Sequence, residues 1–332
     1  MRDLDREETY LVDRTGLALE LRDLVGTGPV PGEAYPGPHA ALGYGEGQFA
    51  ALLSGLPDWG EEGTLFLLEG GYDLGEAAGM ALLAETGRAR VVRVGFRPGV
   101  EVHIPPSPLA PYRYLRFLLL ATGREEVLRS VDEALLEERR RLGPEVPVEE
   151  NPAKFLAYTL LERLPLFYSP LFRPLEGAVQ TLFARVAKSL SLTPPPSALE
   201  FFLVGLEARH EQGDPLAAVL LGPGEEAALA KEILESRVDA LAEVPATGAN
   251  RLAQVMALWY RMAWTAYYLA RRDPGLRIVI VEREIAGFGA SGRNGAWCAP
   301  DLNISMDRLA RLHGEDAARR MQQATYDAVD EV

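Results

Sequence analysis

Residues 39–56 read HAALGYGEGQFAALLSGL, and this stretch decides the fold. A short apolar run opens into three closely spaced glycines, and residues with helical spacing follow directly. This order predicts a β-strand, a tight turn and an α-helix. Glycine allows a backbone to approach a ligand closely, and the crevice beyond the strand ends is the usual binding site of α/β proteins. Gly43, Gly45 and Gly47 are therefore candidate ligand-binding residues, and the alternative is a turn that serves only the architecture.

The same pattern recurs along the first half of the chain. Residues 64–73 (TLFLLEGGYD) form an apolar run that ends in glycines, and a small-residue helix is predicted from there to Gly87. Residues 88–95 and 100–108 predict two further extended segments, and residues 111–123 predict a helix. Strands that alternate with helices at this spacing predict a parallel sheet covered by helices on both faces.

The second half repeats this theme less regularly. Its predicted helices cover residues 130–141, 153–164, 177–190 and 248–270, with a strand, glycine turn and helix over 214–237 and another strand over 238–246. We therefore expect an α/β protein with two sequential lobes.

The composition disfavours several classes of protein. The chain has 332 residues, of which 48% are hydrophobic and 25% are charged, as expected for a globular protein with two domains. Because it has no run of eighteen apolar residues and begins with charged residues, we expect neither a membrane span nor a secretory signal. The net charge of −14 disfavours nucleic acid and anionic membranes as partners. With Cys298 as its one cysteine and four histidines, the chain is expected to be cytoplasmic, without a disulfide or a metal site.

The order of the predicted elements resembles the bifunctional phosphoglucose/phosphomannose isomerases. The resemblance rests on the lead helix, the GYGEG turn, the second glycine turn, the IPPSPLAPYRYL segment that enters a helix, and the long final helix. Proteins of that family contain two sugar-isomerase (SIS) domains, each a flavodoxin-like parallel sheet. The resemblance implies a lead helix (1–28), a first SIS-like domain (29–124), a helical connector (125–164) and a second SIS-like domain (165–270). It also implies a homodimer.

The two glycine turns depart from that family's pattern. In the family they read GMGGS and SYSGNT, and their hydroxyl and backbone N–H groups hold the sugar phosphate at helix N-termini. Here the first turn ends in Glu46 and Gly47, so a carboxylate and a glycine replace a glycine and a serine. The second turn reads LEGGYD, and the resemblance places Gly70, Gly71 and Tyr72 at the ligand.

The family's catalytic residues are largely replaced in this chain. The family's arginine aligns with Leu109, and Arg113 lies one helical turn further on. The segment that carries the family's glutamate base reads RVAKSLSLTPPPS here and contains no acid. The family's histidine aligns with Glu200, and His210 lies ten residues beyond it. Arg113, Glu200 and His210 are the remaining catalytic candidates.

Residues 264–332 resemble a different family, the FAD-dependent oxidoreductases of the amino-acid oxidase type. The motifs are WTAYYLARRDPGLRIVIVEREIAGFGASGRNGAWC and MDRLARLHGEDAARRMQQATYDAVDEV. This resemblance implies that Glu282 binds the adenosine ribose and that Ser291, Arg293 and Asn294 line the flavin. The GxGxxG turn that should precede this piece is replaced by VMALWYRMA. We therefore expect an incomplete Rossmann-like fragment (271–332) joined at WTAYYLA, and no bound FAD.

These observations lead to one main hypothesis and two alternatives. The main hypothesis is a protein that binds a sugar phosphate and resembles the isomerases of glucose 6-phosphate and mannose 6-phosphate, with most of the family's aldose–ketose catalytic groups replaced. The first alternative is a non-catalytic SIS-fold dimer with a structural or regulatory role. The second is an FAD-dependent oxidoreductase, which the missing glycine turn disfavours.

Overall fold

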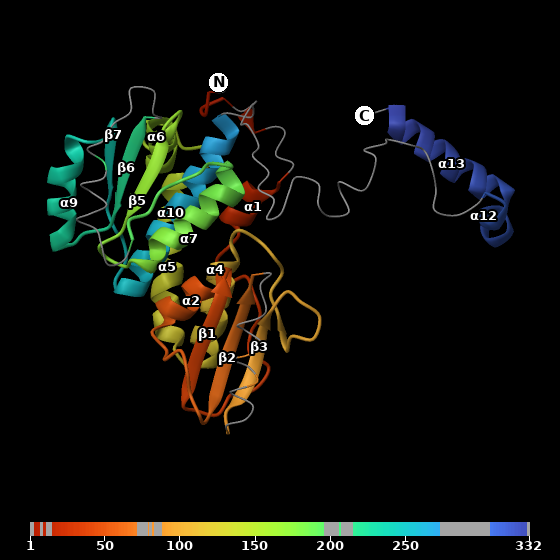
Figure 1. Cartoon of the computed structure of the whole chain (residues 1–332), viewed down its shortest axis with the longest axis horizontal. Helices are drawn as coiled ribbons and strands as arrows, with labels where there is room; N and C mark the ends of the chain where they lie inside the picture. Colours follow the sequence, from red (N-terminus) through yellow and green to blue (C-terminus); the bar gives the residue numbers. More distant parts are fainter. Residues whose placement is uncertain are drawn as a thin grey trace. The chain divides into compact units, whose positions relative to one another are not determined.

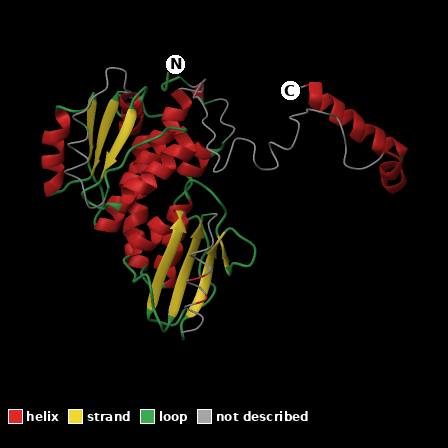
Figure 2. Ribbon diagram, in the orientation of Figure 1, coloured by secondary structure: helices red, strands yellow, loops and turns green. Residues whose placement is uncertain are grey.

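The computed structural model describes residues 3–6, 9–10, 15–71, 79, 82, 88–195, 206, 215–272 and 306–330. The chain divides into two compact units, Met1–Leu276 and Arg277–Val332. Within its described residues, the first unit contains two parallel sheets, each accompanied by helices (Figure 2). It is therefore an α/β fold, as the alternation of strands and helices predicts.

The first lobe is built on four parallel strands in the order β1-β2-β3-β4. They are β1 (His39–Gly45), β2 (Thr64–Gly70), β3 (Arg90–Gly95) and β4 (Val102–His103). Helix α2 (Glu46–Ser54) begins directly after β1 and packs against β1, β2 and α4 (Ala110–Ala121). The strand, turn and helix predicted for residues 39–56 are confirmed.

The second lobe is built on three parallel strands, β5 (Leu164–Tyr168), β6 (Leu216–Leu221) and β7 (Ala240–Val244), with α9 (Glu225–Glu235) packed against β6 and β7. β5 pairs with β6 along one edge, and Leu192 forms a parallel bridge to Leu166. The Leu192 segment follows β5 in sequence but lies on the edge opposite to β6. The strand order therefore reverses at β5, and ligands of open α/β sheets bind beyond the carboxyl end of such a strand.

The start of the second lobe corrects the sequence analysis, which predicted a helix through residue 164. Helix α6 (Pro152–Leu160) ends earlier, and β5 begins at Leu164. Glu162 between them has a φ of 58°, a left-handed conformation that non-glycine residues seldom adopt. The turn itself contains no glycine or proline, Pro165 comes only after it, and the leucines on either side continue the helical spacing.

Two other helices differ from their predicted limits. The helix predicted over residues 130–141 starts earlier, as α5 (Glu125–Leu142). The helix predicted over residues 177–190 is α7 (Pro174–Leu182), which continues as a π-helical segment, η2 (Phe183–Ala187). The helix predicted up to residue 87 lies mostly outside the described residues.

Helix α10 (Arg251–Arg272) connects the parts of the first unit. It packs against α1 (Leu17–Arg22), α5, α6, α7 and η2, and nearly all of residues 253–269 are buried (Figure 1). A helix that is buried around nearly its whole circumference is typical of a protein core. None of the helices in the described part of the chain, α10 included, is long and apolar enough to cross a membrane.

A buried ion pair fixes α10 to α5. Arg261 donates two hydrogen bonds to Glu138, at 2.8 Å and 2.5 Å, and the Thr247 hydroxyl donates a third at 2.7 Å. Both charged side chains are almost completely buried, with exposed fractions of 3% for Arg261 and 0% for Glu138. A pair this deep is costly to break, because the remaining charge would stay buried without a partner.

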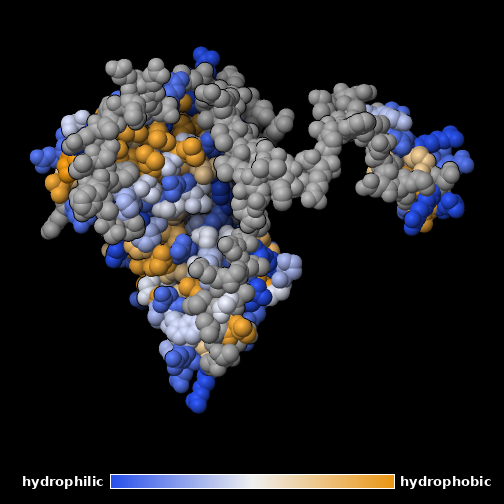
Figure 3. Space-filling view, viewed as in Figure 1, coloured by the Kyte–Doolittle hydropathy of each residue, from blue (hydrophilic) through white to orange (hydrophobic). Residues whose placement is uncertain are grey.

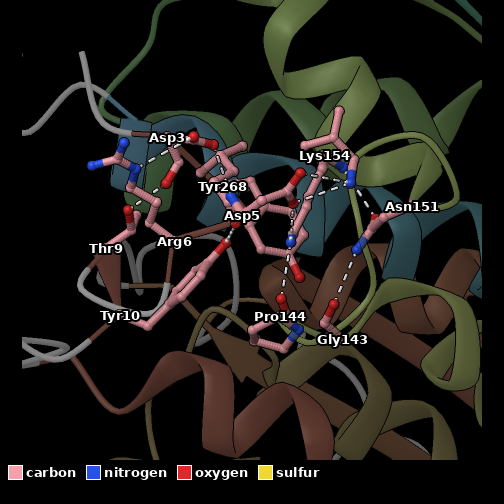
Figure 4. A network of polar contacts seen from close by, with 12 residues as sticks. Asp3, Asp5, Arg6, Thr9, Tyr10, Gly143, Pro144, Asn151, Lys154 and Tyr268 are labelled. Atoms are coloured by element: carbon pink, nitrogen blue, oxygen red, sulfur yellow. Dashed lines mark hydrogen bonds and ion pairs between the residues drawn. The ribbon is translucent and has the colours of Figure 1, made fainter.

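The N-terminal segment is fastened to α6 by Lys154 (Figure 4). The Lys154 ammonium group donates to the Asp5 carboxylate at 3.0 Å and to the Pro144 carbonyl at 2.9 Å. It also lies 5.8 Å from the ring centres of Tyr10 and Tyr268. The lysine is fully buried, so these contacts compensate for the loss of its hydration.

The described part of the second unit consists of two helices. They are α12 (Met306–His313) and α13 (Glu315–Asp330), and they contact each other. Gly314 joins them with a φ of 87°, which suits glycine because it has no Cβ.

Candidate active site

A cavity of about 530 Å³ lies between the two lobes of the first unit. The start of α2 and the loop before α4 form one side, and α7 and η2 form the other, with Trp259 of α10 completing the lining. Figure 1 shows α2 and α7 next to each other between the two sheets, and the two helices are in contact. Figure 3 shows apolar surface over α2 beside more polar surface over α7. The charged residues of the lining are Glu46, Arg173, Glu176 and Arg185.

A larger cavity, of about 740 Å³, lies elsewhere in this unit. It is lined by α1, the end of α5 and Trp264, away from the strand ends of both sheets. Two of its arginines are already paired, Arg22 with Asp23 at 2.8 Å and Arg140 with Glu137 at 2.9 Å. We place the candidate site in the smaller cavity, because that one contains the first glycine turn and the β5–α7 connection.

The glycines of the two turns pack against each other. A Cβ on Gly47 would lie 2.5 Å from the Leu68 carbonyl oxygen, and one on Gly70 would lie 2.8 Å from the Glu46 nitrogen. Gly43 and Gly45 are equally confined, by the α2 backbone and by Gly70. All four glycines are thus required for close backbone contact, and Gly45 is the one that also lines the cavity. Their role as ligand-binding residues stays a prediction.

Glu46 is the first residue of α2 and forms an ion pair with Arg185 of η2. The pair connects the two lobes across the cavity lining. The Glu46 side chain is 10% exposed and that of Arg185 is 39% exposed. Burial lowers the pKa of Arg185, and Glu20 counteracts this effect. The acid that the sequence analysis found in the first turn therefore has a basic partner, contributed by the other lobe.

Glu176 lies on α7, just beyond the carboxyl end of β5, where the strand order reverses. Its Oε1 atom accepts a hydrogen bond from the Ser169 backbone N–H at 2.8 Å and lies 3.2 Å from Nε of Arg173. The residue is only 4% exposed. Burial raises the pKa of Glu176 from 4.5 to about 7, although the Ser169 hydrogen bond and the Arg173 charge act in the opposite direction. Near neutral pH this carboxyl group can therefore accept or donate a proton.

Arg173 is held by several partners at once. Its guanidinium group donates to the carbonyl oxygens of Pro194 and Pro195, at 3.0 Å and 3.2 Å, and lies over the Tyr168 ring at 5.0 Å. Together with the contact to Glu176, these interactions fix the β5–α7 connection. Arg173 is thus less available to a ligand than Arg185.

Arg113 lies on α4 and points to the lead helix. It donates to Glu20 of α1 at 2.7 Å and approaches the Thr27 hydroxyl at 3.4 Å. Glu20 also accepts a hydrogen bond from Ser107. These contacts join α1 to α4, and Arg113 is not part of the cavity lining. Its catalytic role stays a prediction without support from this geometry.

The second glycine turn is also tied down by ion pairs and hydrogen bonds. Glu69 is 2% exposed and pairs with Arg93 of β3 at 2.6 Å. Arg97 donates to the Gly71 carbonyl at 3.1 Å. Glu69 therefore stabilises the sheet.

Several predicted site residues lie outside the described part of the chain. They are Tyr72, Glu200 and His210 of the isomerase-like region, and Glu282, Ser291, Arg293 and Asn294 of the tail. Within the described ranges, no group of three or more histidine, cysteine, aspartate or glutamate side chains is arranged to hold a metal ion.

Sequence reasoning missed Glu176, Arg173 and Arg185 as site residues. The stretch YSPLFRPLEG carries no motif that marks its arginine or its glutamate. The useful signal would have been β5 itself, because a strand ending at Tyr168 places the following residues at the carboxyl edge of the sheet.

Comparison with known proteins identifies three segments of this chain. Residues 17–123 match the family model for the phosphoglucose isomerase N-terminal domain, and residues 149–274 match the bacterial phospho-glucose isomerase C-terminal SIS domain. Residues 263–331 match the FAD dependent oxidoreductase family. The resemblances drawn from the sequence, and the SIS-type α/β fold, are thus confirmed.

Two relatives extend this result. A bifunctional phosphoglucose/phosphomannose isomerase from Caldicellulosiruptor bescii is 24% identical over 234 residues, which cover 61% of this chain and 67% of that protein. The crystal structure of a glucose-6-phosphate isomerase like protein from Thermus thermophilus is 96% identical, with a TM-score of 0.78. The match covers 82% of this chain and 94% of that one.

The isomerase and oxidoreductase matches overlap over residues 263–274. In the structure, residues 263–269 of α10 are buried in the core, where Trp264 stacks on Tyr268 and the Tyr268 hydroxyl donates to the Leu142 carbonyl at 2.5 Å. The beginning of the oxidoreductase match therefore serves the first unit and does not fit a flavin site.

Proposed function

We propose, since this chain belongs to the phosphoglucose isomerase family, that it binds a phosphorylated sugar between its lobes and interconverts the aldose and ketose forms there. One observation carries the proposal: the cavity brings the first glycine turn together with Arg185 and Glu176. The arginine could bind an anion and the glutamate could move a proton. No flavin or metal is needed for this proposal.

The cavity has the size and lining that a sugar phosphate requires. Its volume of about 530 Å³ is within the usual range for small-ligand sites. Leu52 offers exposed apolar surface for the C–H face of a sugar, beside the buried rings of Phe49 and Trp259, and Gln48 and Thr181 offer hydrogen-bonding groups. Arg185 is the partly exposed cation of the lining and is the candidate partner of the phosphate.

Aldose–ketose isomerisation needs a base that moves a proton between two neighbouring carbons. The base removes the proton from C2, the electron pair forms the C1–C2 double bond, and the carbonyl oxygen O1 takes up a proton. Return of the proton to C1, with loss of the O2 proton, gives the ketose. Glu176 suits this role, because a base is most effective when its pKa lies near the working pH.

An isomerase assay with purified full-length protein tests this proposal. We expect conversion of fructose 6-phosphate to an aldose phosphate, and a loss of kcat by about 10²-fold or more in Glu176→Gln, as is typical for removal of a general base. Glu243→Gln serves as the control, because Glu243 is an exposed carboxylate that pairs with Lys231 on the surface. Equal rates in the two variants would exclude Glu176 as the base.

Calorimetry with the same sugar phosphate separates binding from turnover. Binding without turnover would favour the alternative of a non-catalytic SIS-fold protein, and no binding would remove the sugar-phosphate proposal. We also propose a homodimer, as the family resemblance implies, and sedimentation velocity would measure it.

A further inference from the structure

The ion pair between Glu46 and Arg185 occupies the place where a phosphorylated ligand would need a free cation. Glu46 belongs to the first lobe and Arg185 to the second, and both line the cavity. Resting on the function proposed above, we propose that Glu46 acts as a built-in competitor: it holds Arg185 in the empty site, and the ligand's phosphate must displace it. Glu46 then sets the affinity of the site for anions.

Arg185 is the group for which a ligand would compete. The other arginine of the lining, Arg173, is committed to Glu176 and to two carbonyl oxygens. Arg185 has 39% of its side chain exposed, and among the described residues Glu46 is its ion-pair partner. The guanidinium group of an arginine can donate two parallel hydrogen bonds to two oxygen atoms of a phosphate. A contact with a single carboxylate oxygen is weaker than this paired arrangement.

The backbone at the start of α2 does not offer a second anion site. Gly70 lies so close that a Cβ on it would stand 2.8 Å from the Glu46 nitrogen. The N–H groups that would hold a phosphate at a helix N-terminus are therefore covered by the end of β2. Arg185 is therefore the main group in this cavity that can bind a phosphate.

Displacement of Glu46 is possible because the carboxylate keeps a favourable position without Arg185. It occupies the first turn of α2, where the positive end of the helix dipole stabilises an acidic side chain. The neighbouring acid, Glu20, is already held by Arg113 and Ser107 and does not need Arg185. The helix dipole thus lowers the cost of freeing the Glu46 carboxylate when a phosphate dianion takes its place on Arg185.

Calorimetric titration of the full chain with fructose 6-phosphate, inorganic phosphate and neutral fructose tests this inference. Removal of the competing charge in Glu46→Gln should tighten binding of both phosphates by about tenfold, which corresponds to about 1.4 kcal/mol. Fructose should bind equally to both proteins. Glu62→Gln is the matched control, because it removes the same charge at an exposed position of the first lobe, and its affinity should stay within about twofold of the parent.

The double variant Glu46→Gln/Arg185→Gln tests whether the effect of Glu46 on binding depends on Arg185. If Glu46 acts through Arg185, the gain from Glu46→Gln should disappear once Arg185 is removed. Circular dichroism verifies that each variant is folded, and Glu46→Asp, which shortens the side chain by one methylene, provides a milder second variant with an intermediate gain.

The outcomes separate this inference from the proposed function. If the parent binds fructose 6-phosphate and folded Glu46→Gln binds it no more tightly, the competition is refuted and the proposed function stands. If neither protein binds a phosphate, both are refuted. A gain that persists without Arg185 would also overturn the inference.

Discussion

Restoring the family's serine side chain at the first turn should destabilise this protein. The family pattern GMGGS has serine where this chain has Gly47, so Gly47→Ala and Gly47→Ser are natural substitutions. A Cβ at this position would lie 2.5 Å from the Leu68 carbonyl oxygen and 2.7 Å from the Leu68 Cβ, and Leu68 belongs to the buried strand β2. Real Cβ atoms essentially never come closer than 3.0 Å to a non-bonded atom, so α2 or β2 must shift.

The cost follows from two opposing effects. Overpacking of a rigid core costs about 1–3 kcal/mol. Replacing glycine by alanine in a helix raises stability by up to about 1 kcal/mol, because alanine has the higher helix propensity. Because the contact at 2.5 Å is with backbone, the upper end of the overpacking cost applies and the net loss for Gly47→Ala should be about 2 kcal/mol. At about 2–4 °C per kcal/mol, Tm should decrease by roughly 4–8 °C.

Thermal unfolding followed by circular dichroism measures this loss, and Gly177→Ala is the matched control. Gly177 lies inside α7, and a Cβ on it would meet no atom within 4 Å. This variant should gain about 0.5–1 kcal/mol from helix propensity alone. If Gly47→Ala proved as stable as Gly177→Ala, the close packing of the two glycine turns would be refuted, and an open, ligand-facing turn would be the better description.

Three further predictions concern buried charges. Because burial raises the pKa of Glu176 to about 7, this residue stabilises the fold below about pH 4.5 and loses that contribution as the pH rises through 7. Denaturant titrations at several pH values should show the parent losing about 3 kcal/mol relative to Glu176→Gln across this range, and parallel curves would contradict the assignment. Glu138→Ala should cost about 3–5 kcal/mol in urea unfolding, because its buried arginine partner loses its counter-charge, whereas the exposed Glu137→Ala should change stability by less than about 1 kcal/mol. Lys154→Met should release Asp5, so hydrogen exchange should accelerate at residues 3–6 with little change in overall stability, and unchanged exchange would show that the lysine does not fasten this segment.

The strands of the first lobe could be predicted from the sequence because its signals are local. Apolar runs that end in glycine mark β1 and β2, and the glycines mark the turn that follows each of them. β5 could not be predicted in the same way, because the turn before it uses Glu162 in a left-handed conformation. Nothing in the residue type signals that turn, and the surrounding leucines continue the helical pattern.

The candidate site was only partly predictable. The glycine turns were found from their spacing, but their mutual packing depends on a contact between two turns that lie far apart in sequence. Glu46 was correctly noted as an unusual acid, but its partner, Arg185, lies 139 positions later and in the other lobe. The pKa of Glu176 depends on burial, which a single sequence does not reveal. Long-range pairing and desolvation are the two effects that sequence patterns do not encode.

The contacts of the N-terminal segment have a consequence for synthesis on the ribosome. Asp5 needs Lys154, Tyr10 packs on Tyr267 and Tyr268, and the Leu21 carbonyl accepts from Tyr260 at 2.8 Å. The contacts of Tyr10 and Leu21 therefore cannot form until α10 has emerged, whereas Asp5 can already bind Lys154 of α6. At about 5–20 residues per second, this delay is on the order of tens of seconds. Part of the segment that is made first is thus packed only after nearly the whole first unit has been made.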